Sequence, residues 1–287
     1  MRSPDVRLTL FPVSRRWLDR HSNPHTRRAY RGDLVEFVTY QRIDTDNEFR
    51  SVTQEHLLRW LNNLERRKIA EPTQCRKLAA LSSLFDHLLK AGITRKNPAK
   101  SIRRPTGARR IKTRYALTDA ESQALLLLPL RDDVRSARDR ALLSVLLNHG
   151  LTRSEASLLR VSDMDNDHLR VRGRNGNIRL VPLHPDTLRE LEVYLWRTRN
   201  EGSAFGPLFR PIRNNRTGVL DRALTPDGIY RVVRRHLGLL NIAGGTRVMR
   251  TTAAMQALAR EADVVRVQKW LGYTSIAATR KYLRVTK

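Results

Sequence analysis

The sequence predicts a mainly α-helical protein with a small β-sheet: an all-helical N-terminal domain followed by an α+β domain. Helix-period apolar stripes fill the first hundred residues, a basic segment rich in turn residues follows, and one hairpin pattern interrupts the later helices. At 287 residues, the chain is long enough for two domains that each bury a core. We therefore expect a domain at 1–98, a linker at 99–114 and a domain at 115–287.

We expect four helices in the first domain, because apolar stripes alternate there with capping and turn residues. We expect the first three helices to start at Ser14, Thr26 and Thr53, and the fourth helix to end at Gly92. The stripes of the last three helices are Tyr30, Leu34, Phe37 and Val38; Leu57, Leu61 and Leu64; and Leu78, Leu81, Phe85 and Leu88. These stripes predict one apolar core.

The segment NPAKSIRRPTGARRIKTR (97–114) breaks the helical pattern, because it contains two prolines and a glycine. It carries several basic residues and no acidic one. We interpret it as an extended linker lying along a phosphate backbone; a disordered hinge is a compatible interpretation. The arginines concerned are Arg103, Arg104, Arg109 and Arg110.

The second domain begins with a capping box formed by Thr118 and Glu121. A strongly apolar helix ends at Gly150, and RSEASLLR predicts a short helix. HLRVRGRNGNIRLVPL alternates as a hairpin around a Gly/Asn-rich turn. Its alternating apolar residues are Leu169, Val171, Ile178 and Leu180. Further helices are predicted to start at Asp186, Thr225, Thr246 and Asp263.

Net charge is the strongest functional signal in the composition. The chain has 55 Lys+Arg and 28 Asp+Glu, a formal net charge of +27. Residues 1–105 hold 22 basic and 11 acidic residues, so 106–287 hold the other 33 and 17. Two basic domains suit a protein that holds a polyanion from two sides and gains affinity by releasing counterions. Nucleic acid is the favoured partner; a ribosome-like or merely Arg-rich protein is the alternative.

Composition also argues against several classes of protein. No run of about 18 apolar residues is present, so we expect no transmembrane helix and no membrane partner. The first twenty residues lack an apolar core of signal-peptide length. Cys75 is the only cysteine, which excludes an intramolecular disulfide, and the eight histidines show no metal-ligand spacing. We expect a cytoplasmic, nucleoid-associated protein without a metal site.

Four segments of the second domain occur in a defined order. They are HGLTRSEASLLRVSDMD (149–165), VRGRNGNIRLVPL (171–183), GGTRVMRTTAAMQAL (244–258) and WLGYTSIAATRKYLRV (270–285). Their content, order and spacing resemble the tyrosine recombinases, the phage integrase or Xer-like family. The helical first domain is similar to that family's core-binding domain, so the resemblance covers nearly the whole chain. It implies a core-type DNA-binding domain, a basic linker and a tyrosine-recombinase catalytic domain.

The resemblance implies that a tyrosine hydroxyl attacks a DNA phosphodiester, leaving a 3′-phosphotyrosyl link and a free 5′-hydroxyl. The link conserves bond energy, so no cofactor or metal is required, and positive donors must stabilise the phosphorane. Tyr282 matches the nucleophile, nine residues after Tyr273 and 32 after Arg250. Arg250 matches the second family arginine, whose planar fork suits two phosphate oxygens.

The first family arginine is the most consequential departure from the family pattern. Thr152 occupies its place, and Arg153 follows one residue later, about 100° further around a helix. Arg153 would therefore point elsewhere unless the turn is remodelled. We nevertheless expect Arg153 to help Arg250 hold the scissile phosphate.

Three further positions also differ. The hairpin lysine expected as general acid aligns with Arg174, and a guanidinium is a poor proton donor. Arg247 replaces the histidine of the H-x-x-R motif, and Tyr273 replaces the histidine of L-G-H. We expect the two arginines to add positive charge and Tyr273 to add a hydrogen bond.

Five basic residues on the first domain's helices are candidates for a DNA face, with a solvated helix surface as the alternative for each. They are Arg27, Arg28, Arg31, Arg76 and Lys77. The leading hypothesis is site-specific recombination or integration at core-type sites in double-stranded DNA, for a phage or mobile element. We expect a homo-tetramer on DNA, or association with a partner recombinase. With five residues after Tyr282, we expect no further subunit-coupling helix there.

The alternative function belongs to another class. The altered positions are also compatible with a recombinase-fold DNA-binding accessory or regulatory protein that cleaves weakly or not at all. A generic DNA-packaging protein would leave the ordered motifs unexplained.

Overall fold

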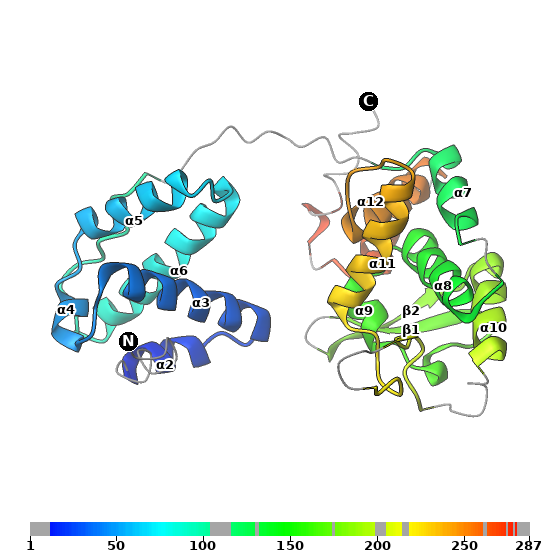
Figure 1. Cartoon of the computed structure of the whole chain (residues 1–287), viewed down its shortest axis with the longest axis horizontal. Helices are drawn as coiled ribbons and strands as arrows, with labels where there is room; N and C mark the ends of the chain where they lie inside the picture. Colours follow the sequence, from blue (N-terminus) through cyan, green and yellow to red (C-terminus); the bar gives the residue numbers. More distant parts are fainter. Residues whose placement is uncertain are drawn as a thin grey trace. The chain divides into compact units, whose positions relative to one another are not determined.

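The computed structural model divides the chain into two compact units, Met1–Arg110 and Ile111–Lys287 (Figure 1). The structure describes residues 12–103, 116–129, 132–173, 176–198, 205–213, 218–260, 263–273, 275–277 and 279. In these residues, the first unit is helical and the second combines helices with one two-stranded sheet. The predicted fold class is therefore confirmed.

The described part of the first unit contains five helices, one more than predicted. They are α2 (Pro12–Asp19), α3 (Pro24–Gln41), α4 (Asp46–Arg50), α5 (Gln54–Arg66) and α6 (Glu71–Lys90). The additional helix is α4, which begins with a capping box: Thr45 Oγ1 accepts a hydrogen bond from the Glu48 amide, and the Glu48 carboxylate accepts one from the Thr45 amide. The T-x-x-E spacing of TDNE was the signal for it.

The predicted stripes of the first unit converge on one core. The side chains of Leu34, Phe37 and Trp60 are almost fully buried there, and the last two rings meet edge to face. Ala99 and Ile102 are buried in the same core. The unit therefore continues beyond residue 98, where the sequence predicts the linker to begin.

The second unit is built around a central helix, α8 (Val134–His149), which packs against α7, α10 and α12 (Figure 1). Asp133 caps its start, and Gly150 ends it with a left-handed φ of 60°. The other helices among the described residues are α7 (Asp119–Leu127), α9 (Arg153–Leu158), η1 (Val161–Asp163), α10 (Pro185–Thr198), α11 (Pro226–Leu239), α12 (Thr246–Ala259) and α13 (Val264–Leu271).

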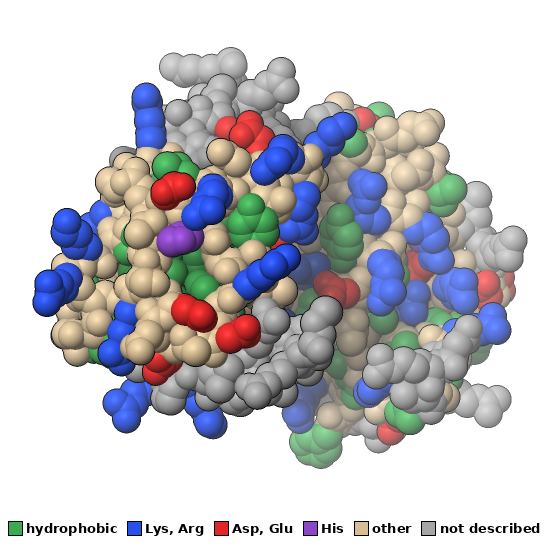
Figure 2. All heavy atoms as spheres, turned by 60° about the vertical axis from the view of Figure 1, so that its left-hand side comes forward, with side chains coloured by type: hydrophobic (Ala, Val, Ile, Leu, Met, Phe, Trp, Pro, Cys, Tyr) green, Lys and Arg blue, Asp and Glu red, His purple; other side chains and the backbone are tan. Residues whose placement is uncertain are grey.

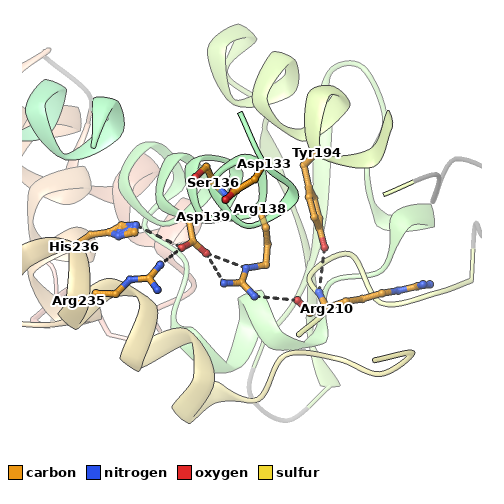
Figure 3. Close-up of polar contacts among 8 residues, drawn as sticks. All are labelled: Asp133, Ser136, Arg138, Asp139, Tyr194, Arg210, Arg235 and His236. Atoms are coloured by element: carbon orange, nitrogen blue, oxygen red, sulfur yellow. Dashed lines mark hydrogen bonds and ion pairs between the residues drawn. The ribbon is translucent and has the colours of Figure 1, made fainter. Parts of the chain in front are cut away.

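A buried carboxylate joins α8 to α11 (Figure 3). Asp139 accepts a hydrogen bond from Arg138 Nη2 at 2.6 Å, pairs with Arg235, and lies 3.5 Å from His236 Nε2. Burial lowers the pKa of His236, so the neutral imidazole is favoured despite the carboxylate. These contacts hold α8 and α11 together.

The sheet is an antiparallel hairpin of β1 (His168–Arg172) and β2 (Ile178–Pro182). Leu169 and Val171 are buried as the alternation predicts, but Ile178 and Leu180 are 59% and 60% exposed. The register explains the difference, because Val181 pairs with Leu169 and Arg179 pairs with Val171. Paired residues share one face of a sheet, so the inward residues of β2 are Arg179 and Val181.

Candidate active site

The centre of the candidate site is Arg250, on the second turn of α12. Its side chain is buried, and its Nη1 donates to the Gly150 carbonyl oxygen at 2.7 Å. Nη2 donates to the Leu271 carbonyl oxygen at 2.5 Å, and Nε donates to the Tyr273 hydroxyl at 3.0 Å. One guanidinium thus connects the ends of α8 and α13.

Tyr273 lies directly after α13, where Gly272 ends the helix in a left-handed conformation with φ 68°. The Tyr273 amide donates to the Gln268 carbonyl oxygen, which fixes the turn. The Arg250 guanidinium carbon lies 4.6 Å from the Tyr273 ring centroid, within cation–π distance. The structure therefore brings these two predicted site residues together.

Glu155 lies beside Arg250, and it is held there by Thr152, the threonine at the position of the first family arginine. Thr152 caps α9: its Oγ1 accepts a hydrogen bond from the Glu155 amide at 3.2 Å, and Glu155 Oε2 accepts one from the Thr152 amide at 2.7 Å. Oε2 also lies 3.6 Å from Arg250 Nη1. Burial raises the pKa of Glu155, but Arg179 and the Thr152 contacts outweigh burial and hold that pKa below its usual value. The carboxylate therefore stays charged.

Arg179 is a member of the site that motif reasoning missed. Its Nη1 donates to Glu155 Oε1 at 2.6 Å, and its Nε donates to the Trp270 carbonyl oxygen at 2.8 Å. One signal in the sequence could have found it: Arg179 stands two residues before Val181, so both side chains lie on the same face of the strand, and that strand pairs with a strand whose apolar residues are buried. Only the register shows that it faces inward.

Arg153 contacts another part of the unit. Its Nη1 donates to Asp227 Oδ1 at 3.0 Å, and its guanidinium carbon lies 5.7 Å from the Tyr230 ring centroid. Both partners belong to α11. The turn before α9 is not remodelled, because Thr152 is the capping residue and Arg153 is the first helical residue. The contacts of Arg153 therefore do not support its expected place beside Arg250.

The remaining predicted site residues are only partly described. Arg247 is exposed on the first turn of α12. Tyr282 and Arg174 lie outside the described residues, so their predicted roles stay predictions. Among the residues that the structure describes, no group of three His, Cys, Asp or Glu side chains could hold a metal ion. Over the same residues, no helix is long and apolar enough to cross a membrane.

The predicted DNA-face residues of the first unit fall into two groups. Arg27, Arg28 and Arg31 are exposed on α3, and Arg103 is exposed after the last core contact. Lys and Arg side chains are spread over the visible surface rather than confined to one spot (Figure 2). Arg104, Arg109 and Arg110 lie outside the described residues.

Two candidates on α6 differ from this expectation. Lys77 is buried, and its ammonium pairs with Asp33 at 3.1 Å and also with Glu36. Arg76 is partly exposed and also pairs with Asp33. Two carboxylates already pair with the Lys77 ammonium, so the structure does not support its assignment to a DNA face. A helix-surface pattern cannot reveal acidic partners on α3.

Similarity to solved structures first defines the class. The site-specific recombinase XerH, in a post-cleavage complex with palindromic difH substrate, matches with a TM-score of 0.71 and 20% identity, covering 91% of this chain and 76% of that one. A lambda integrase dimer bound to a COC′ core site matches with a TM-score of 0.69 and 16% identity, covering 93% of this chain and 76% of that one. The fold is therefore a recombinase fold.

Sequence similarity then gives the family. Residues 116–287 match the phage integrase family, and residues 16–92 match the phage integrase N-terminal SAM-like domain. The tyrosine recombinase XerC of Pelobacter propionicus is 32% identical over 276 residues, covering 93% of this chain and 87% of its own. That of Roseiflexus castenholzii is 32% identical over 273 residues, covering 92% and 84%. The chain belongs to the phage integrase family of tyrosine recombinases.

Proposed function

We propose that this protein is a site-specific recombinase that breaks and rejoins double-stranded DNA through a 3′-phosphotyrosyl intermediate. The observation that carries the proposal is the position of Arg250. Its hydrogen bonds reach Gly150 and Tyr273, and Glu155 links it to Arg179, so all four family segments meet around one guanidinium. Family membership supports the reaction, and this convergence supports a phosphate-binding site at Arg250.

In this proposal Tyr282 Oη gives up its proton and attacks the phosphorus, the bond from phosphorus to the 5′-oxygen breaks, and the leaving oxygen takes up a proton, so the proton count is unchanged. The reverse attack by a 5′-hydroxyl restores a phosphodiester, so no net oxidation or hydrolysis occurs. A guanidinium has five N–H donors, and Arg250 uses three in hydrogen bonds to the protein. Its remaining N–H groups serve the phosphate oxygens, and the three bonds hold the guanidinium in place before charge develops.

The proposal extends to assembly and location. Paired core-type sites are brought together by a homo-tetramer or by association with a partner recombinase, in the cytoplasm on the nucleoid. Similar solved structures support binding to double-stranded core-type sites, since one is an integrase dimer on a core site and another a recombinase on a palindromic substrate.

The test uses DNA that the protein itself selects. Duplexes enriched from a random-sequence pool are rebuilt with a nick beside the cleavage position, so that a short fragment leaves and cleavage cannot reverse. A covalent protein–DNA adduct should appear on a denaturing gel, and Tyr282→Phe should abolish it because the attacking oxygen is gone. Tyr230→Phe, at an exposed tyrosine of α11, is the matched control and should keep the adduct.

A second candidate function is a recombinase-fold DNA-binding protein that does not cleave. It is favoured by Thr152 at the first-arginine position and by the engagement of Arg153 with Asp227. Tight, sequence-specific binding without an adduct on the nicked duplex, also with a partner recombinase present, would establish this function and exclude the first.

A further inference from the structure

Arg179 places a charged side chain where the hairpin alternation otherwise buries an apolar one. Arg179 lies opposite Val171 on the partner strand and on the same face of β2 as Val181, and both valines are fully buried. The Arg179 side chain is itself only 15% exposed. Removing a guanidinium from water costs several kcal/mol unless partners compensate it, so such a position needs a reason.

Neighbouring backbone carbonyls hold Arg179 and Arg250. The Trp270 oxygen accepts from Arg179 Nε, and the Leu271 oxygen accepts from Arg250 Nη2. The Glu155 carboxylate lies between the two guanidiniums, 2.6 Å from Arg179 Nη1 and 3.6 Å from Arg250 Nη1. Two cations with one carboxylate leave one positive charge in excess, which favours an anion.

The backbone around Arg179 leaves room for its guanidinium. A Cβ atom on Gly272 would lie 2.9 Å from Nη1 and 3.1 Å from Cζ, and a Cβ atom on Gly173 would lie 3.5 Å from Nη1. Real Cβ atoms essentially never approach within 3.0 Å, so any other residue at 272 would displace the arginine. Glycine at 272 therefore allows Arg179 to reach Glu155.

One nitrogen of Arg179 is unsatisfied. Nη2 is buried and has no hydrogen-bond partner among the residues that the structure describes, although Nε and Nη1 are both bonded. Leaving a buried donor without an acceptor costs free energy, and such groups are rare in folded proteins. A phosphate oxygen is an acceptor of matching charge for this N–H group, and it would reach Nη2 once the atoms that cover this nitrogen move on DNA binding.

The site also lacks the arginine that the family pattern expects. Thr152 occupies that position and caps α9, while Arg153 is engaged by Asp227 on α11. We propose that Arg179 is the second guanidinium of the site and binds a non-bridging oxygen of the scissile phosphate beside Arg250. This inference rests on the proposed function, because it assigns a contact to the same phosphate.

The first experiment measures adduct formation on the selected, nicked duplex. Arg179→Ala should slow cleavage by about 100-fold or more, the usual effect of removing one donor to a developing oxyanion. Arg172→Ala is the matched control: it removes another hairpin arginine that pairs with a buried carboxylate, Asp163, and should stay near the wild-type rate. An Arg179→Ala rate equal to that of the control would overturn the inference.

A second measurement separates phosphate binding from a structural role. A methylphosphonate at the scissile position removes one negative charge, so it needs one positive donor less. The Arg179→Ala deficit should therefore shrink at least tenfold on methylphosphonate DNA relative to phosphate DNA. A purely structural loss would be the same on both substrates, and that result would reject the contact. Should Arg179→Ala fail to fold, Arg179→Gln carries the same comparison, because it removes the positive charge but keeps a polar side chain with N–H donors.

The two proposals fail separately. If the wild-type protein binds its selected duplex but gives no adduct, the cleavage proposal fails. The contact of Arg179 with the scissile phosphate is then tested by measuring DNA-binding affinity. The wild-type protein should then bind phosphate DNA more tightly than methylphosphonate DNA, and Arg179→Ala should lose that preference. An unchanged preference in the variant would reject the role of Arg179.

Discussion

At the scale of single residues, the charges around Arg250 are fixed near neutral pH. Guanidinium groups remain protonated in proteins, and Glu155 stays ionised because its pKa is held below the usual value. Arginine and tyrosine also stand at the two positions where the family pattern has histidines, Arg247 and Tyr273. Below pH 6.5, we expect buried histidines to make the stability of this unit depend on pH.

His149, at the end of α8, is one such residue. Burial lowers its pKa from 6.5 to about 4, nearby His184 adds to this effect, and a hydrogen bond to the Pro182 backbone opposes it. Between pH 6.5 and 4 the unfolded chain therefore binds a proton that the folded chain does not, so the free energy of unfolding falls as the pH falls. The loss should reach about 3 kcal/mol by pH 4. Urea unfolding of wild-type protein and His149→Gln across this range checks it; equal pH dependence in both would contradict the assignment.

At the scale of elements, β2 shows how a one-residue register difference moves a residue into the site. The sequence contains two interleaved sets, Ile178 with Leu180 and Arg179 with Val181, and apolar content favours the first set for the interior. Pairing with β1 puts the second set inside, because Val181 lies opposite Leu169. The interior then gains an arginine, which Glu155 and the Trp270 carbonyl compensate.

The start of α9 gives an element-scale prediction. Thr152 Oγ1 accepts the Glu155 amide hydrogen bond, so Thr152→Ala should lower the free energy of unfolding by about 1 kcal/mol, the usual cost of losing a cap. Thr152→Ser keeps the hydroxyl and should be close to neutral. Denaturant unfolding of both variants measures the difference. Equal stability of the alanine and serine variants would show that the cap contributes nothing.

At the scale of the whole molecule, the +27 charge is distributed over both units, which predicts a strongly salt-dependent complex with DNA. Binding that releases six or more counterions should weaken by about 1000-fold between 50 and 200 mM salt. Replacing Arg27 and Arg28 together by Gln should reduce the log–log salt slope by about 2 if both contact phosphates. Fluorescence anisotropy with the selected duplex at several salt concentrations measures these slopes. A nearly flat dependence would contradict binding by both units.

Local sequence signals predicted much of the fold and part of the site. Capping boxes, apolar stripes and glycine stops depend on neighbours within a few residues, and they predicted the helices that end at Gly150 and begin at Thr246. Motif order likewise brought Arg250 and Tyr273 into one site. The roles of Tyr282 and Arg174 remain predictions, because those residues lie outside the described ranges.

The sequence by itself therefore determined the helical architecture, the basic character and the identity of the central arginine. Only the tertiary structure decided how individual cations are used: Lys77 pairs with acids of α3, Arg153 pairs with Asp227 of α11, and Glu155 links Arg179 to Arg250. The physical reason is that periodicity is encoded over a few residues. The state of a charged side chain depends instead on burial and on partners tens of residues away in the chain.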